Sequence, residues 1–286
     1  MGVSSSSCRL SGRVAVVTGA SRGIGAAIAE RLGSEGATVV VAARTLDHAD
    51  PRFPGTLRET AEAVGRAGGR AVVATADLSV SSDRQRLVAV AEAEAGPVDI
   101  LINNAAVTFF RPVDGFDLHR YDLMFEVQVK APFHLAQLVL PGMRERGEGW
   151  IVNVSSGASR HPTMPPGEHA VRGGTVYGMC KAALERLSTG LAAEVYNDGV
   201  TVNALSPARV VPTPGTLFHG LVSPDSPPER VEHPAVMAEA ALLLASAPPH
   251  SLTGRVVTSA ALLKELGVPV PADPSSSEPE DREPVR

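Results

Sequence analysis

The sequence predicts a single doubly wound α/β domain, in which seven parallel strands form one sheet with helices on both faces. Short apolar, β-branched runs recur along the chain and alternate with longer stretches of helical periodicity. This alternation is typical of parallel sheets whose strands are joined by right-handed helical crossovers. The length of 286 residues and the 44% of hydrophobic residues are enough for one large core.

Each strand is expected where a short apolar run lies between turn-prone segments. The first run, VAVVT, is apolar at consecutive positions, as expected for a strand that is buried on both faces. The predicted strands are residues 14–18, 38–42, 71–75, 100–103, 151–155, 200–205 and 255–257. The predicted helices are residues 25–32, 56–66, 84–95, 118–144, 176–196 and 235–245.

Three Pro- and Gly-rich segments interrupt the alternation, at residues 47–55, 160–174 and 206–234. They are expected to be loops around a binding site, and the prolines of the third segment argue against regular structure there. Residues 1–9 are predicted to be a flexible leader, and residues 10–267 the folded domain. Residues 268–286 are rich in Pro, Ser and charge, which is typical of a disordered tail.

The composition excludes several classes of protein. A net charge of −5 gives no basic footprint for nucleic acid, and no apolar run is long enough to span a membrane. The start MGVSSSSCRL lacks the apolar centre of a signal peptide, and its match to a myristoylation pattern is interpreted as chance. Cys8 and Cys180 are not expected to pair, which is consistent with a reducing cytoplasm.

A glycine-rich turn follows the first strand and opens the first helix, in the sequence TGASRGIG. Gly19 allows a tight turn, Gly23 lets the backbone approach a pyrophosphate, and Gly25 lets helix and strand pack closely. The free N–H groups of the helix N-terminus then face the phosphates. Because the spacing departs from G-x-G-x-x-G, an ordinary glycine loop is the alternative.

Tyr177 and Lys181 lie four positions apart in a predicted helix and therefore share one face. A neighbouring ammonium stabilises a phenolate and lowers its pKa. A shift of about 3 units needs roughly 4 kcal/mol, which one charge at about 4 Å can supply at intermediate dielectric. Tyr177 is thus a candidate acid and base. Taken alone, a Tyr and a Lys at this spacing are more often two ordinary polar helix residues.

Four short motifs follow predicted strands in a fixed order: TGASRGIG at 18–25, NNAA at 103–106, NVSS at 153–156 and YGMCK at 177–181. Together they resemble the short-chain dehydrogenase/reductase family over roughly residues 10–257. The resemblance implies a Rossmann fold, binding of NAD(H) or NADP(H), and interconversion of alcohols and carbonyls by hydride transfer. No metal site is expected.

The resemblance also implies roles for particular residues. Tyr177 matches the catalytic acid/base, and Lys181 matches the lysine that lowers its pKa and holds the nicotinamide ribose. Ser156 matches the serine that hydrogen-bonds the reacting oxygen, with Ser155 as the alternative. The remaining residues expected to contact or adjoin the cofactor are Gly19, Ser21, Arg22, Gly23, Ile24, Gly25, Arg44, Asp77, Asn104 and Val210.

The sequence departs from the family pattern at several points. Gln128 stands where the family has an Asn. The backbone carbonyl of that Asn holds a water that belongs to a proton relay in the family. We expect Gln128 to keep this carbonyl, with altered geometry of the relay. Ala106 and Ala208 each replace a glycine of the family pattern. Thr213 lies one residue later than the position that contacts the cofactor in the family. The long gap before Tyr177 predicts an inserted loop over the site, in which two histidines, His161 and His169, are expected to face solvent.

The end of the second predicted strand favours NADP(H) over NAD(H). NAD-binding relatives place an acidic residue there to bind the ribose hydroxyl. Here the chain reads VVVAAR, so that Arg44 could instead bind a 2′-phosphate, with Arg22 as a second positive charge. The alternative is that both are solvated surface arginines.

The sequence therefore predicts an NADP(H)-dependent oxidoreductase for an alcohol/carbonyl pair. The expected rim of the site is apolar and includes Phe109, Phe110, Met164, Leu217 and Phe218. A homodimer or homotetramer is expected by analogy, with the Tyr177 helix at an interface. The alternatives are a catalytically impaired nucleotide-binding regulator, motivated by Gln128 and Ala208, and a reductase of C=C bonds, which the YGMCK spacing disfavours.

Overall fold

The protein forms a seven-stranded parallel sheet with helices on both faces, in a computed structural model that describes residues 8–166 and 173–271. The predicted fold class is confirmed, and each predicted strand is present with bounds within two residues. The strands are β1 (Val14–Thr18), β2 (Thr38–Ala43), β3 (Arg70–Thr75), β4 (Ile100–Asn103), β5 (Gly149–Val154), β6 (Val200–Ser206) and β7 (Val256–Thr258). Their order in the sheet is β3-β2-β1-β4-β5-β6-β7.

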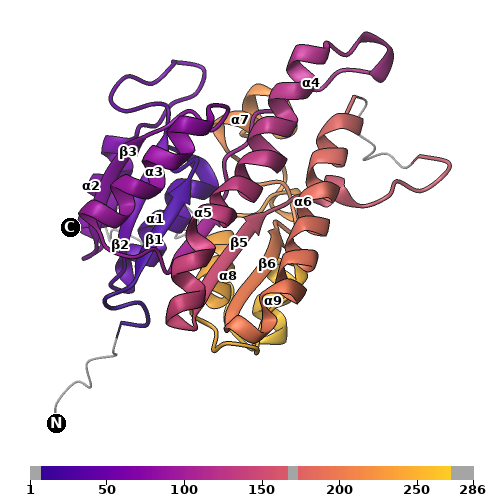
Figure 1. Cartoon of the computed structure of the whole chain (residues 1–286). Coiled ribbons are helices and arrows are strands. Elements are labelled where there is room, and N and C mark those ends of the chain that lie inside the picture. The colour runs from indigo at the N-terminus through magenta and orange to yellow at the C-terminus, as the bar shows by residue number, and fades with distance from the viewer. Residues whose placement is uncertain (1–7, 167–172, 272–286) are drawn as a thin grey trace, which may run out of the picture.

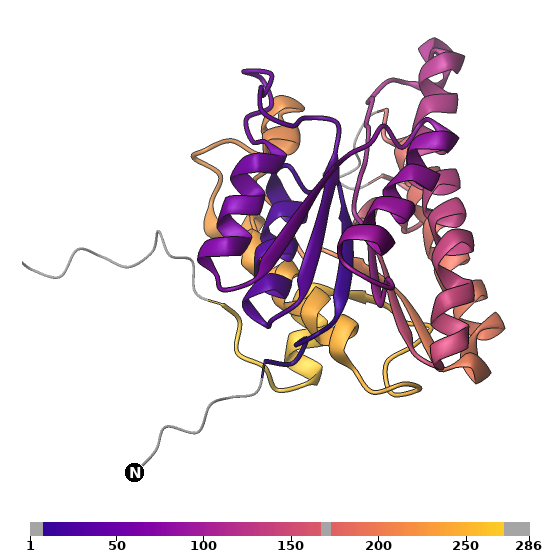
Figure 2. The same ribbon diagram turned by 60° about the vertical axis from the view of Figure 1, so that its left-hand side comes forward.

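Helices pack on the two faces of this sheet as separate layers (Figures 1 and 2). The helices are α1 (Gly23–Ser34), α2 (Leu57–Arg66), α3 (Ser81–Glu94), α4 (Leu118–Phe125), α5 (Ala131–Arg146), α6 (Thr175–Glu194), α7 (Pro214–Phe218), α8 (Pro234–Ser246) and α9 (Ser259–Glu265). One core cluster joins the sheet to α1, α2, α8 and α9, and a second joins it to α3, α5 and α6.

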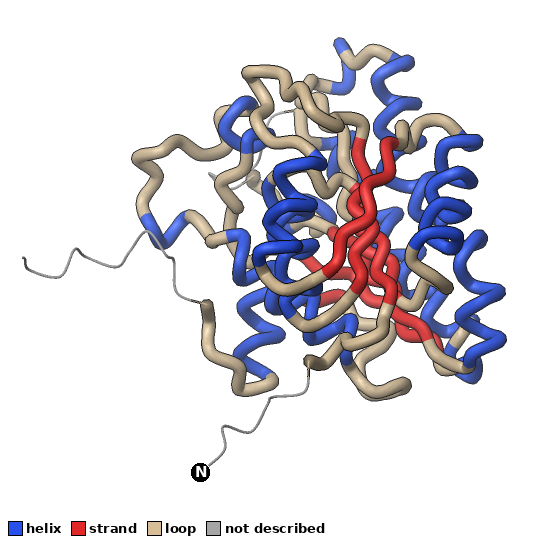
Figure 3. The backbone as a smooth tube through the Cα atoms, turned by 90° about the vertical axis from the view of Figure 1, so that its left-hand side faces the viewer, coloured by secondary structure: helices blue, strands red, loops and turns tan. Residues whose placement is uncertain are grey.

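The strands lie between two sets of helices (Figure 3), and each face of the sheet carries its own apolar cluster. Neighbouring side chains of β1 point to opposite faces: Ala15 and Val17 belong to one cluster, and Val14 and Val16 to the other. All five residues of β1 are buried, which explains why the run lacks polar alternation. Because the strand order turns around between β1 and β4, the loops after these strands diverge at their carboxyl ends.

The predicted helix 118–144 is interrupted, which corrects the expectation of one continuous helix. A π-helical segment, Glu126–Lys130, lies between α4 and α5. Pro132 stands at the start of α5 and has no N–H with which to satisfy the carbonyl of Gln128, four residues earlier, as an α-helix requires. The widened turn therefore lies at the position where the sequence departs from the family pattern. α4, which precedes this widened turn in the chain, projects from the body of the molecule (Figure 1).

The segment 206–234 was expected to lack regular structure, and this expectation is wrong. It contains α7, whose capping box joins Thr213 and Thr216, with Pro214 at the first helical position where no N–H is needed. A 3-10 turn, Pro228–Arg230, follows. α9 was not predicted either, since it is only seven residues long.

Residues near both ends of the predicted domain pack against the core. Leu10 is buried in the core and its backbone N–H donates to Glu35 O at 2.9 Å. Val268 also packs on the core, although the predicted tail begins there. Residues 1–7 of the predicted leader, residues 272–286 of the predicted tail and His169 of the predicted loop lie outside the residues that the structure describes. Within the described ranges, no helix combines the length and apolarity needed to cross a bilayer.

The contact between α1 and α2 predicts a pair of opposite stability changes. A Cβ at Gly33 would lie 2.7 Å from Cγ1 of Val64, whereas a Cβ at Gly65 meets nothing within 4 Å. Both glycines stand second to last in their helices. Gly33→Ala should lower the free energy of unfolding by about 1–3 kcal/mol through overpacking. Gly65→Ala should raise it by about 0.5–1 kcal/mol through helix propensity.

Urea unfolding followed by circular dichroism measures both changes. Gly65→Ala is the control for the intrinsic effect of replacing glycine. Changes of the same sign in the two variants would contradict the close approach of α1 to α2.

Candidate active site

The glycine-rich turn between β1 and α1 adopts the backbone that the sequence predicts. Gly19 and Gly23 have φ values of +64° and +57°, a region that favours glycine. A Cβ at Gly25 would lie 2.4 Å from Gly19 O and 2.4 Å from Asn104 Nδ2. α1 then begins without a side-chain cap and without an acidic residue in its first turn. Its free N–H groups are therefore suited to a phosphate.

Asn104 holds this turn from the neighbouring strand. Its Nδ2 donates to Thr18 O at 2.9 Å and to Gly19 O at 3.1 Å, and its backbone N–H donates to Thr18 Oγ1 at 3.0 Å. The Thr18 hydroxyl, itself buried, donates to Ile102 O. Asn104 thus fixes the shape of the turn through hydrogen bonds that span β1 and β4.

Ser156, Tyr177 and Lys181 come together where β5 ends and α6 begins. The Ser156 hydroxyl is within hydrogen-bonding reach of the half-buried Tyr177 phenol and lowers its pKa. The Lys181 ammonium lies 5.7 Å from the centroid of the Tyr177 ring and donates to Val154 O at 2.9 Å. Gly178 permits this approach, because a Cβ there would lie 2.7 Å from Ala158 O.

Burial controls the pKa values of this group. Desolvation raises the pKa of Tyr177 above its ordinary value, and the Ser156 hydrogen bond offsets only part of that effect. Burial also lowers the pKa of Lys181 to about 8. The expectation that Lys181 lowers the pKa of Tyr177 is therefore not met in the protein by itself. Burial, the Ser156 hydroxyl and Cys180 account for the shift of the Tyr177 pKa, and the Lys181 charge is not among its causes.

The two neighbouring serines have different surroundings. Ser155 is buried, and its hydroxyl donates to Glu185 Oε1 at 2.7 Å; Ser159 Oγ donates to the same oxygen at 2.6 Å. Only the Ser156 hydroxyl reaches Tyr177. Glu185 was not singled out from the sequence, although it lies four residues after Lys181 on the same helical face.

Gln128 lies in the π-helical segment and is almost fully buried. Its Nε2 donates to Val107 O at 2.8 Å, which ties the segment to the loop after β4. Its Oε1 has no hydrogen-bond partner among the described residues. Since a buried amide oxygen is normally satisfied, this atom is suited to a buried water.

The region after β2 contains two arginines with different surroundings. Arg22 is partly buried and donates to Phe53 O, and to Thr45 Oγ1 at 3.1 Å. Burial lowers the pKa of Arg22, and the nearby charge of Arg44 lowers it further. Arg44 is exposed, and its guanidinium makes no hydrogen bond or ion pair within the part of the chain that is described. The charges of Asp50 and Glu59 oppose the shift of the Arg22 pKa, but the unengaged Arg44 guanidinium near Arg22 is suited to an anion.

Asp77 follows β3, and its Oδ1 accepts hydrogen bonds from Ser79 N at 2.9 Å and Ser79 Oγ at 2.7 Å. This carboxylate therefore caps the turn into α3. Val210, in the loop after β6, pairs with Val231 in an isolated parallel bridge. Both residues lie at the same edge of the sheet as the glycine-rich turn, which agrees with their predicted placement.

A buried carboxylate organises the loop after β6. Glu232 accepts from Ala208 N at 3.2 Å and from Ser259 Oγ at 2.5 Å. Burial raises the pKa of Glu232, and these two hydrogen bonds oppose that effect. This role could not be predicted from the sequence, because Glu232 lies within a segment that was expected to be irregular.

α7 lies against the glycine-rich turn. A Cβ at Gly23 would lie 2.9 Å from Thr213 Cγ2, so Thr213 reaches this turn despite its displaced position in the sequence. A Cβ at Gly173 would lie 2.7 Å from the backbone of Arg111, so the chain just before α6 passes close to the loop after β4. His161 is exposed, as predicted.

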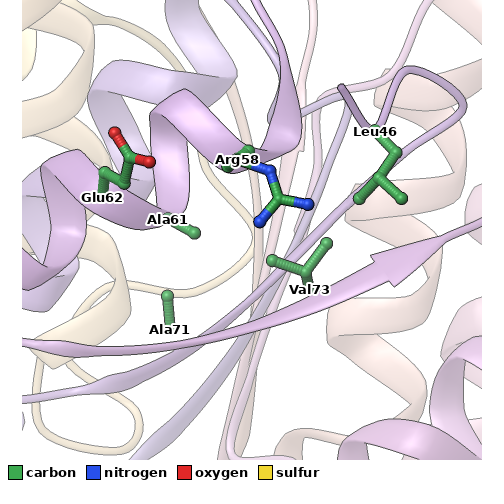
Figure 4. A pocket seen from close by; sticks show the side chains of 6 residues that line it. All are labelled: Leu46, Arg58, Ala61, Glu62, Ala71 and Val73. Atoms are coloured by element: carbon green, nitrogen blue, oxygen red, sulfur yellow. The ribbon is translucent and has the colours of Figure 1, made fainter. Parts of the chain in front are cut away.

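Of the predicted rim residues, Phe109 packs in the same small apolar cluster as Tyr177, around Met124, and lies under the Arg120 guanidinium, 4.9 Å from the ring centroid. Met164 is 80% exposed. A shallow hollow beside α2 and β3 has a lining that does not include Tyr177 (Figure 4). It is lined by Leu46, Arg58, Ala61, Glu62, Ala71 and Val73.

The fold and the arrangement of these side chains define a Rossmann-type oxidoreductase. Residues 13–216 match the short chain dehydrogenase family. A short chain dehydrogenase of Pseudocercospora fijiensis is 36% identical over 204 residues, which are 71% of this chain and 61% of the relative. The ketoacyl reductase HetN of Nostoc is 33% identical over 80% of this chain and 76% of the relative.

The solved structures agree. A metagenomic short-chain oxidoreductase in complex with NADP superposes with a TM-score of 0.71 and 33% identity, covering 87% of this chain and 98% of that one. The chain belongs to the short-chain dehydrogenase/reductase family and is an NAD(P)-dependent oxidoreductase.

The buried Lys181 predicts a specific pH dependence of stability. Its folded pKa of about 8 lies below the value of about 10.4 in an unfolded chain. Between these values the unfolded state holds more protons, so the contribution of Lys181 to stability rises with pH, by up to about 3 kcal/mol. The difference in unfolding free energy between the wild type and Lys181→Met should therefore increase from pH 7.5 to pH 10.

Urea unfolding at several pH values measures this difference. Comparison with the variant removes the opposing alkaline titrations, including that of Cys180, whose pKa burial raises to about 11. A difference that stays constant across the window would show that Lys181 keeps an ordinary pKa in the folded protein.

Proposed function

We propose that the protein interconverts an alcohol and a carbonyl with NADP(H), and that Tyr177 is the catalytic acid/base. The observation that carries this proposal is the placement of one phenol beside Ser156, with Lys181 one helical turn behind it. The glycine-rich turn and the uncapped start of α1 lie at the same edge of the sheet. They fit the pyrophosphate of a dinucleotide.

The phenol is suited to give a proton. A phenol is protonated near pH 7 at its ordinary pKa of about 10, and the raised pKa of Tyr177 keeps it so, which is the form needed to protonate a carbonyl oxygen during reduction. When bound, the dinucleotide supplies the hydride that adds to the carbonyl carbon. Ser156 and Tyr177 donate hydrogen bonds to the oxygen as negative charge develops there, and the Tyr177 proton then moves to it.

The other residues position this group. Lys181 binds the nicotinamide ribose and remains charged below about pH 8. Gln128 holds the buried water through which Tyr177 is reprotonated, using its free Oε1 or its backbone carbonyl. Gly19, Ser21, Gly23, Ile24, Gly25, Asp77, Asn104 and Val210 are the remaining residues of the proposed cofactor site.

NADP(H) is the preferred cofactor in this proposal. Arg44 and Arg22 lie close enough for Arg44 to lower the pKa of Arg22, and no acidic residue occupies the end of β2. A 2′-phosphate would neutralise this repulsion. The NADP in the related metagenomic oxidoreductase is consistent with the preference.

We also infer a homo-oligomeric, cytoplasmic enzyme. Both described cysteines are free, which suits a reducing compartment. α5 and α6 each expose a large apolar side chain, Phe133 and Met179, at 48% and 44%. Exposed apolar side chains on adjacent helices suit an interface between subunits.

Replacing Tyr177 tests the mechanism. Tyr177→Phe removes the proton donor and should reduce carbonyl reduction by at least about 100-fold, since acid–base groups contribute roughly 10² to 10⁴. NADPH binding, measured by fluorescence titration, should be retained. NADPH oxidation is followed across a panel of aldehydes, ketones and keto-steroids.

A variant that keeps full activity would overturn the role of Tyr177. Binding of NADPH by the wild type without oxidation by any carbonyl of the panel would favour the alternative of a nucleotide-binding regulator.

Replacing Arg44 tests the choice of cofactor. Arg44→Asp should lower kcat/KM for NADPH relative to NADH by roughly 10- to 100-fold, because a charged hydrogen-bond donor becomes a repelling carboxylate. Arg66→Asp makes the same charge change at the far end of α2, on a residue whose side chain is 72% exposed. This control should leave the ratio unchanged. Equal ratios in Arg44→Asp and the wild type would exclude Arg44 from the 2′-phosphate site.

A further inference from the structure

A row of aromatic rings covers Tyr177. The Phe110 ring meets the Tyr177 ring edge to face, with centroids 5.8 Å apart and an interplanar angle of 70°. The His219 imidazole also contacts the Phe110 ring, with centroids 5.1 Å apart and an interplanar angle of 88°. Phe110 comes from the loop after β4, and His219 caps the C-terminus of α7. Phe110 therefore contacts both the proposed acid/base and a planar ring from a separate element.

α7 is held in this position by contacts at both ends. Phe218 packs against Phe53 of the loop after β2, with ring centroids 4.7 Å apart, and against His219 at 5.2 Å. The capping box of Thr213 and Thr216 fixes the helix start. The position of His219 relative to Phe110 is thus set by packing rather than by an exposed loop end.

The nitrogens of the His219 imidazole are not engaged by the rest of the described chain. The ring is partly buried, and burial lowers its pKa below the ordinary value, which favours the neutral imidazole at pH 7. Within residues 8–166 and 173–271, its side chain makes ring contacts but no hydrogen bond or ion pair. A neutral imidazole and a phenyl ring that meet edge to face offer the geometry that aromatic groups prefer.

We propose that Phe110 and His219 are specificity-determining residues that bind the planar ring of an aryl carbonyl substrate beside Tyr177. The inference rests on the proposed carbonyl reduction. An aryl ring can take part in the edge-to-face contacts that Phe110 makes with Tyr177 and His219. A saturated ring of the same size fills similar space but lacks the π system on which these contacts depend.

The test compares acetophenone with cyclohexyl methyl ketone, two methyl ketones of equal carbon number, as substrates for NADPH-dependent reduction. The wild type should show the higher kcat/KM for acetophenone. Phe110→Leu and His219→Leu should each lower the ratio of the two kcat/KM values by roughly 2- to 12-fold, the range of aromatic pair contributions. Phe110→Tyr and His219→Phe keep a ring at each position and should preserve the ratio.

A matched control is available at the far end of α6. Tyr196 and His250 form an aromatic–imidazole pair with centroids 4.7 Å apart, so Tyr196→Leu breaks a similar contact away from the site. It should leave the ratio unchanged. Retained NADPH binding shows that each variant is folded.

Unchanged ratios in both leucine variants, or a wild-type preference for the cyclohexyl ketone, would overturn the inference while carbonyl reduction stands. If the enzyme reduces other carbonyls but neither of these two ketones, the inference fails while the proposed function stands. If no carbonyl is reduced at all, the proposed function fails together with the inference.

Discussion

The close approach of α6 to the end of β5 is the constraint on which the rest of the candidate site depends. It is fixed by the hydrogen bond from Lys181 Nζ to Val154 O at 2.9 Å, and by Gly178, whose missing side chain leaves room for Ala158 O. Without this approach, Tyr177 would not lie beside Ser156. One backbone carbonyl and one glycine therefore align three side chains that are separated by up to 25 residues in the sequence.

A second junction links this group to the glycine-rich turn. The buried Thr18 hydroxyl and the Asn104 amide tie the end of β1 to the end of β4, across the point where the strand order reverses. These bonds explain how a short parallel sheet can hold a backbone cradle and an acid/base group at one edge. Each junction contains one fully buried hydrogen bond, from Lys181 Nζ to Val154 O and from Thr18 Oγ1 to Ile102 O, and buried polar groups are costly to leave unsatisfied.

Burial decides the electrostatics of the site more than any single charge. It raises the pKa of Tyr177 and of Glu232 and lowers that of Lys181. The sequence suggested the opposite direction for Tyr177, because spacing alone shows which charges are neighbours and not how far each is desolvated. Tyr177 is therefore a phenol and not a phenolate near pH 7, which is the form that gives a proton during reduction of a carbonyl.

The sequence by itself determined the fold class, the strands and the order of the motifs, because buried apolar runs and glycine turns are local signals. Only the tertiary structure decided how Gln128, Glu185, Glu232 and His219 are used. Their surroundings come from distant segments: Val107 for Gln128, Ser155 for Glu185, Ser259 for Glu232 and Phe110 for His219. α7 was missed for a related reason, since a short proline-initiated helix depends on its capping contacts and packing rather than on periodicity.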